Sequence, residues 1–203
     1  MVFWLHPSDF SRYDNYVGNG QSALLQAAKS SIQNTYWNTD VSGDGQVVVV
    51  KFSDGMQFDV VPAFEKDDGS FLFPDSNDGG KWKKCDPRPE ITAIQKMDDK
   101  TNGNLKWLCR MGRAWKEQMD VPIKGLLIDT LAYNFIQDWE YREKSFLYYD
   151  WMSRDFFRYA ADQKDDQWFW YVPGSNQLVV NVTNFRWKAT RAYNISLEAI
   201  DYA

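Results

Sequence analysis

The stretch from Val47 to Pro62 constrains the fold of this chain more than any other. Four consecutive valines lead to a Ser53-Asp54-Gly55 turn, and a second apolar run follows. Two strands joined by an Asp-Gly turn form a β-hairpin on local grounds. Proline cannot donate to a strand ladder, so Pro62 is expected to end the second strand.

The second strand of this hairpin carries one acid, Asp59, among apolar neighbours. Side chains alternate along a strand, so Phe58 and Val60 share one face and Asp59 lies on the other. A carboxylate buried without a partner costs free energy. Asp59 therefore indicates either a strand end that faces water or a metal ion bound in a cleft, and the hairpin by itself leaves both interpretations open.

Composition excludes several classes of protein. The chain has 203 residues, 44% of them hydrophobic and 17% aromatic, which is enough to bury the core of one large domain or two small lobes. Its net charge of −5 argues against bulk binding of nucleic acid. The two cysteines and the single histidine match no zinc spacing, and a reduced, cytoplasmic setting is the simplest expectation. No apolar run is long enough to predict a membrane span.

The pattern changes from strands to helices along the chain, so we expect two lobes, residues 1–88 and residues 89–203. Glu65 to Gly80 is rich in Asp, Gly and Ser and is expected to be mostly loop, followed by a hinge over 81–89. Residues 168–174 are expected to form an aromatic, turn-bound segment. Besides the hairpin, the predicted strands are 2–5 and 178–182, and the predicted helices are 8–31, 90–97, 104–119, 125–141, 146–161 and 189–202.

Six motifs carry a family resemblance through their order and spacing. They are Asp59-Val-Val-Pro-Ala63, Gly79-Gly-Lys-Trp82 with Asp86-Pro87, Gly103 to Trp115, Gly125-Leu-Leu-Ile-Asp-Thr130, Lys144 to Trp151, and Pro173-Gly-Ser-Asn-Gln177. Together they resemble the polymerase-β-like nucleotidyltransferases, and most of all the bacterial cyclic-oligonucleotide synthases (CD-NTases). The resemblance implies an α+β fold: an incomplete polymerase-β-like sheet lobe, the palm, over 1–88, packed on a helical lobe over 89–203.

The resemblance also implies an activity. CD-NTases make cyclic oligonucleotide second messengers from nucleoside triphosphates by two-metal phosphoryl transfer, in bacterial antiphage defence and with defence-system partner proteins. Asp59 matches the third metal-binding acid of the family, which implies a catalytic, metal-holding role with Mg²⁺ or Mn²⁺. Base choice, linkage, ring size, activating signal and oligomeric state do not follow from the motifs.

The chain departs from the family pattern before the hairpin. Family members carry a Gly-Ser motif and an Asp-x-Asp pair there, whereas this chain opens at Met1-Val-Phe-Trp-Leu5, which resembles the residues just after the pair. We therefore expect an N-terminally truncated chain, through a genuine loss or a mis-assigned start, that is inactive by itself. The alternatives are a non-catalytic remnant or nucleotide-binding module, and a structural protein with no site.

A basic face on the segment 104–119 supplies candidate nucleotide contacts. Lys106, Arg110 and Arg113 recur at four- and three-residue steps, which places them on one side of a helix. Like charges at these spacings repel, so the pattern indicates either a bound polyanion or a solvated basic face. The resemblance implies that Arg110 and Arg113 contact phosphate. Lys124 precedes the next predicted helix, whose N-terminus favours anions, and is a fourth candidate.

Overall fold

The computed structural model describes residues 1–201 and leaves Tyr202 and Ala203 outside the description. The chain separates into two compact units, Met1–Asp86 and the part from Pro87 onward. The first is built on a mixed sheet and the second is mainly helical, so the α+β composition expected from the sequence is confirmed.

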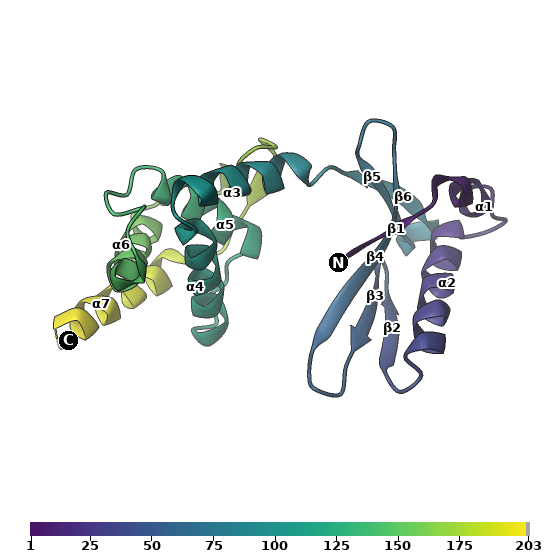
Figure 1. Ribbon diagram of the computed structural model, residues 1–203, viewed down its shortest axis with the longest axis horizontal. Coiled ribbons are helices and arrows are strands. Elements are labelled where there is room, and N and C mark those ends of the chain that lie inside the picture. Colours follow the sequence, from purple (N-terminus) through teal and green to yellow (C-terminus); the bar gives the residue numbers. More distant parts are fainter. Residues whose placement is uncertain (202–203) are drawn as a thin grey trace. The chain divides into compact units, whose positions relative to one another are not determined.

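In the described part of the chain, the first unit contains one six-stranded sheet with helices on one of its faces (Figure 1). The strand order is β2-β3-β4-β5-β6, and β1 pairs in parallel with β4. The elements are β1 (Val2–Leu5), a 3₁₀ turn (Pro7–Asp9), α1 (Phe10–Asp14), α2 (Gly20–Thr35), β2 (Asp40–Asp44), β3 (Val47–Lys51), β4 (Gln57–Glu65), β5 (Phe71–Asp75), a 3₁₀ turn (Asn77–Gly79) and β6 (Lys81–Cys85).

The predicted hairpin is confirmed, with Lys51 opposite Gln57 and Val48 opposite Val60. Its turn is stabilised by a hydrogen bond in which the Met56 N–H donates to Asp54 Oδ1 at 3.0 Å. Gly55 has a φ of +87°, a backbone conformation that residues with a side chain rarely adopt.

The expectation that Pro62 ends the second strand is wrong, because β4 continues to Glu65. On one edge of β4, pairing with β3 stops at Val60 and pairing with β5 starts at Phe64. On the other edge, the Val61 N–H donates to the Met1 carbonyl at 2.8 Å. Pro62 lies between these two ladders, where strand pairing requires no backbone N–H. Proline is therefore tolerated at this position.

The core of the first unit lies between α2 and the hairpin. Leu25 on α2 packs with Val41, Val48, Val50 and Val60, all at most 5% exposed. Burying such apolar side chains contributes about 1.5–3 kcal/mol each to folding before the entropy cost.

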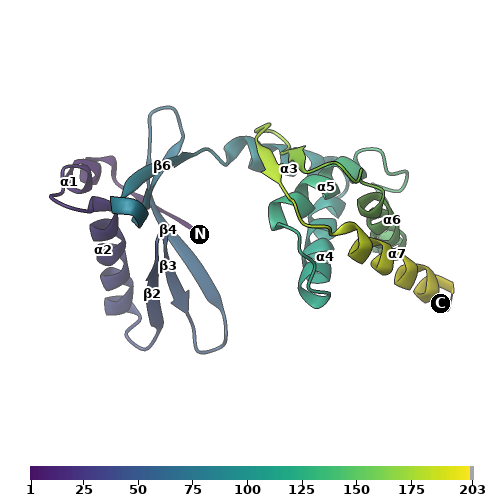
Figure 2. The same ribbon diagram turned by 180° about the vertical axis from the view of Figure 1, so that it is seen from behind.

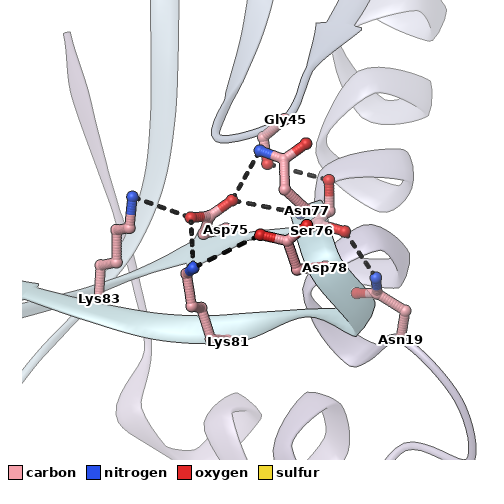
Figure 3. Close-up of polar contacts among 8 residues, drawn as sticks. All are labelled: Asn19, Gly45, Asp75, Ser76, Asn77, Asp78, Lys81 and Lys83. Carbon is pink, nitrogen blue, oxygen red and sulfur yellow. Dashed lines mark hydrogen bonds and ion pairs between the residues drawn. The ribbon is translucent and has the colours of Figure 1, made fainter.

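Polar contacts around the buried Asp75 hold the region of β5, β6 and the turn between them (Figure 3). Asp75, 2% exposed, accepts from Lys83 Nζ at 2.8 Å and from Asn77 Nδ2 at 2.8 Å. The Ser76 hydroxyl donates to the Gly45 carbonyl at 2.9 Å, and Asn19 Nδ2 donates to the Ser76 carbonyl at 2.8 Å. The turn after β5 is thereby joined to the β2–β3 turn and to the N-terminal cap of α2.

In the second unit, α6 and α7 pack against each other and α4 packs against α5 (Figures 1 and 2). The core comprises Leu105 and Leu108 of α4, Leu127 and Leu131 of α5 and Phe156 of α6, each at most 1% exposed. The elements are α3 (Arg88–Lys100), α4 (Asn104–Gln118), α5 (Gly125–Ile136), a 3₁₀ turn (Phe146–Tyr148), α6 (Tyr149–Ala161), β7 (Phe169–Tyr171), β8 (Leu178–Val180) and α7 (Arg186–Asp201).

Several local expectations need correction. The predicted helix 8–31 is divided into α1 and α2, which starts at Gly20 behind the capping side chain of Asn19. The predicted loop 65–80 and hinge 81–89 contain β5 and β6. The predicted aromatic turn holds β7, paired with β8. The helix predicted over 125–141 ends at Ile136, and that predicted over 189–202 begins earlier, with its last residue outside the described range.

Candidate functional site

The predicted site residues divide between the two units: Asp59 lies in the first, and Lys106, Arg110, Arg113 and Lys124 lie in the second.

Asp59 is exposed on β4, opposite Val49 of β3. Phe58 and Val60 line an apolar pocket on the α2 side of the sheet, so Asp59 lies on the face away from α2. Its carboxylate accepts from Gln57 Nε2 at 3.4 Å, and its backbone carbonyl accepts from the Met1 ammonium at 2.6 Å. The alternation predicted for this strand is confirmed, and β1 begins directly beside Asp59.

A pair of Mg²⁺ ions requires several oxygen ligands, usually from more than one carboxylate. Among residues 1–201, no three His, Cys, Asp or Glu side chains lie close enough together to hold a metal ion. Asp59 can supply one carboxylate ligand. The described residues by themselves therefore do not fit a two-metal site.

Lys106 lies near the start of α4 and is bound to α3. Its Nζ donates to Gln95 Oε1 at 2.6 Å and lies 3.3 Å from Asp98 Oδ2. Its backbone N–H donates to Asp98 Oδ1 at 2.9 Å, so Asp98 also caps the first turn of α4. Asp98 is only 7% exposed and neutralises this lysine within the chain.

Arg113 lies two turns further along α4 and is bound to α5. Its Nε donates to Asp129 Oδ1 at 3.3 Å, and one terminal nitrogen pairs with Asp129 Oδ2. The Asp129 carboxylate raises the pKa of Arg113, so the guanidinium remains charged. Burial, together with contact with Asp129, raises the pKa of the Cys109 thiol, which is therefore a neutral neighbour of the pair.

Arg110 has a different environment. It is exposed, and its guanidinium carbon lies 4.7 Å from the centroid of the Trp107 ring, a cation–π contact. Lys124 is the N-cap residue of α5 and is also exposed. The repulsion among the cations of α4 does not require a bound polyanion, because Lys106 and Arg113 pair with acids and Arg110 packs on an aromatic ring.

One of these cations lines a pocket of the second unit with a volume of 380 Å³, and a second is bonded to an acid of its wall. Lys106 lines it directly, and Arg113 is bonded to Asp129, which also lines it. The remaining lining residues are Glu90, Ile91, Ile94, Gln95, Leu126, Thr130, Val172 and Pro173. The pocket has an apolar wall and a charged rim, the combination found in sites for small polar ligands.

Sequence reasoning missed the acids Asp98 and Asp129. Asp129 is the only charged residue within α5, Gly125–Ile136. A lone acid in an apolar segment was the signal that singled out Asp59, and the same signal at Asp129 could have found this ion pair.

Comparisons with known proteins place the chain among similar sequences and folds. A family model of the Second Messenger Oligonucleotide or Dinucleotide Synthetase domain matches residues 1–98. A probable cyclic nucleotide synthase of Bacillus cereus is 28% identical over 86 residues, which are 40% of this chain and 25% of that protein. The chain is therefore CD-NTase-like.

Solved structures of CD-NTases share the fold. The STING-associated CdnE c-di-GMP synthase of Capnocytophaga granulosa has a TM-score of 0.65 at 12% identity, over 89% of this chain and 64% of that one. GTP-bound DncV of Vibrio cholerae has a TM-score of 0.62 at 11% identity, over 85% of this chain and 48% of that one. Identities this low show a shared fold and nothing finer. The predicted polymerase-β-like fold class is therefore confirmed for this CD-NTase-like chain. The chain spans a quarter of the curated relative and less than two thirds of either enzyme.

No helix among the described residues of this CD-NTase-like chain combines the length and the apolar character needed to cross a bilayer.

Proposed function

We propose that this chain is part of a nucleotidyltransferase that makes cyclic oligonucleotide second messengers from nucleoside triphosphates. The observation that carries the proposal is the match of residues 1–98 to the synthetase domain, a range that includes Asp59 and the strand beside it. Among the relatives with a stated activity are a probable cyclic nucleotide synthase and a c-di-GMP synthase, and DncV of Vibrio cholerae was solved with GTP bound.

In this proposal the helical unit, residues 89–203 of the predicted domain division, binds the triphosphate. Lys106 lines one pocket, and Arg113 is bonded to Asp129 of the same pocket. Lys124 stands at the N-terminus of α5, where the helix dipole favours an anion. Arginine can make two parallel hydrogen bonds to phosphate. Arg110 is exposed and stacked on Trp107, so it is free to reach a second phosphate or an acceptor nucleotide.

Asp59, in the palm unit predicted over 1–88, would serve as one ligand of a divalent ion, Mg²⁺ or Mn²⁺. Two metal ions would activate the attacking hydroxyl and stabilise the leaving pyrophosphate when both are bound. Because the described residues do not provide the further carboxylates, we propose that residues 1–203 alone bind nucleotide without turning it over. The role in antiphage defence, the defence-system partners and the cytoplasmic location remain part of the proposal.

The second candidate is a non-catalytic nucleotide-binding module. It is favoured by one observation, that Asp59 belongs to no group of three or more His, Cys, Asp or Glu side chains among residues 1–201. Both candidates require triphosphate binding, and only the first requires Asp59 to matter for chemistry.

The test is incubation of labelled nucleoside triphosphates and Mg²⁺ or Mn²⁺ with this chain and with a longer polypeptide that supplies an Asp-x-Asp pair ahead of Val2. We expect product from the longer form only. Asp59→Asn should abolish product, whereas Asp40→Asn, which alters an exposed acid of β2, should not. Binding without product from either form favours the module. If Asp59→Asn forms as much product as the unaltered longer form, the proposed role of Asp59 is contradicted.

A further inference from the structure

The contact between Arg113 and Asp129 uses one edge of the guanidinium. Nε and one terminal nitrogen face the two carboxylate oxygens, which leaves the other terminal nitrogen, Nη1, outside the pair. Within residues 1–201, the Arg113 side chain makes no other hydrogen bond. Asp129 is the less exposed partner, with 21% of its side chain accessible against 54% for Arg113. The acid is therefore the fixed member, and the arginine presents its free end to solvent.

The free end of Arg113 lies beside the start of α5. A Cβ built on Gly125 would be 3.3 Å from Arg113 Nη1, closer than to any other guanidinium atom. Gly125 and Asp129 are four residues apart, so they lie on the same side of α5 and the guanidinium spans the turn between them. The absence of a side chain at Gly125 leaves the space in which Nη1 lies.

This position is electrostatically unfavourable for a cation. A helix N-terminus carries partial positive charge, and Lys124 adds a full charge at the N-cap. Asp129 compensates by holding Arg113 through a charge-assisted, two-point contact. An arginine held at a positive helix end, with its outer nitrogen unpaired, is arranged to share an anion with that end.

We propose that Asp129 is a positioning residue for the triphosphate: it fixes Arg113 so that Nη1 points to the α5 N-terminus, where a phosphate is held jointly by Arg113 and Lys124. The inference rests on the proposed function, in which Arg113 contacts phosphate. Cys109 lies against the same carboxylate as a neutral thiol and helps to fill the space around it.

The sign of one substitution separates positioning from simple charge. Asp129 is a negative group near a site for negative phosphate, so through charge alone its removal would tighten binding. If Asp129 holds Arg113 in place, its removal frees a long side chain that must be ordered again on binding, and affinity falls.

The experiment is calorimetric titration of the full chain with Mg·ATP, Mg·GTP and inorganic tripolyphosphate, for the unaltered chain, Asp129→Ala, Asp129→Glu, Arg113→Ala and the double variant. Asp162→Ala is the matched control, an exposed acid on the same unit that pairs with Arg158. We expect Asp129→Ala to weaken binding by about tenfold, Asp129→Glu to recover part of the loss and Asp162→Ala to have no effect. Thermal unfolding of each variant, followed by circular dichroism, confirms that the titrated protein is folded.

The double variant gives a readout that a merely structural role would not move. In the Arg113→Ala background, Asp129→Ala should weaken binding no further, because the arginine that it positions is gone. Additive losses overturn the inference, as does unchanged or tighter binding by Asp129→Ala in a chain whose binding depends on Arg113; in both cases the proposed function stands. If the unaltered chain binds none of the three probes, the proposed function fails, and this inference fails with it.

Discussion

Gly112 of α4 lies so close to Ile128 of α5 that a Cβ built on the glycine would be 2.6 Å from Ile128 Cγ2. Both residues are buried. Each is the chain neighbour of one partner of the ion pair, since Arg113 follows Gly112 and Asp129 follows Ile128. The close approach of the two helices therefore determines the distance across which Arg113 and Asp129 meet.

Gly112→Ala should separate α4 from α5 and destabilise the second unit by about 1–3 kcal/mol, the usual cost of overpacking a core. The added helix propensity of alanine offsets part of this cost, about 1 kcal/mol. Urea unfolding measures the change. Gly43→Ala is the control, because a Cβ there meets no atom within 4 Å. The net loss is therefore up to about 2 kcal/mol, and a Gly112→Ala variant more stable than the unaltered chain would contradict the close packing.

The sequence was sufficient where a signal is local. The hairpin around Asp54 and Gly55 follows from turn chemistry and β-branched residues, and the α4 helix follows from apolar spacing. The strand β5 was missed because its short apolar run, Phe71-Leu-Phe73, lies among turn-forming residues. Its pairing with β6 is accompanied by the contact between Lys83 and the buried Asp75. Contacts of that kind join residues whose proximity only the fold creates.

The same distinction applies to the candidate site. The basic residues of α4 could be found from their spacing, since a helix places them together. Their partners could not, because Asp98 lies on α3 and Asp129 on α5. The sequence therefore indicated three unpaired cations on one helix face. In the structure, two of them form ion pairs and the third makes a cation–π contact.

Asp75 should make the first unit sensitive to acid. Lys83, together with Asn77, lowers the pKa of Asp75 from 3.8 to about 2. For an acid whose pKa is depressed by folding, the stabilisation is complete above the ordinary value and is lost as the pH falls through about 2. Asp75→Asn should lower stability at neutral pH and flatten the decline between about pH 4 and pH 2.

Chemical unfolding of the Asp75 variant at a series of pH values, followed by circular dichroism, measures this effect. Asp78→Asn is the matched control. Asp78 also lies near a lysine of β6, Lys81, but 88% of the Asp78 side chain is exposed. If the two variants show the same acid dependence, the buried contact of Asp75 with Lys83 is not the source of the sensitivity.

Lys106 and Arg110 should differ in their contributions to folding stability, although both should contribute to triphosphate binding. Lys106→Ala removes contacts to Gln95 and to the buried Asp98, so it should cost about 1 kcal/mol of stability and also weaken triphosphate binding. Arg110→Ala removes a contact at the surface and should change stability by less than about 0.5 kcal/mol while weakening binding. Parallel urea unfolding and nucleotide titration separate the two effects. An Arg110 variant that loses stability more than the Lys106 variant would contradict the contacts described.

We propose above that the helical unit binds nucleoside triphosphates through Arg113 and its neighbours. The most direct measurement is equilibrium titration of the chain with ATP, GTP, CTP and UTP in Mg²⁺, beside the Arg113→Ala variant. We expect saturable binding of at least one triphosphate, weakened by about tenfold or more in the variant and weakened also by added salt. Absence of binding by all four, or binding that Arg113→Ala leaves unchanged, would contradict it.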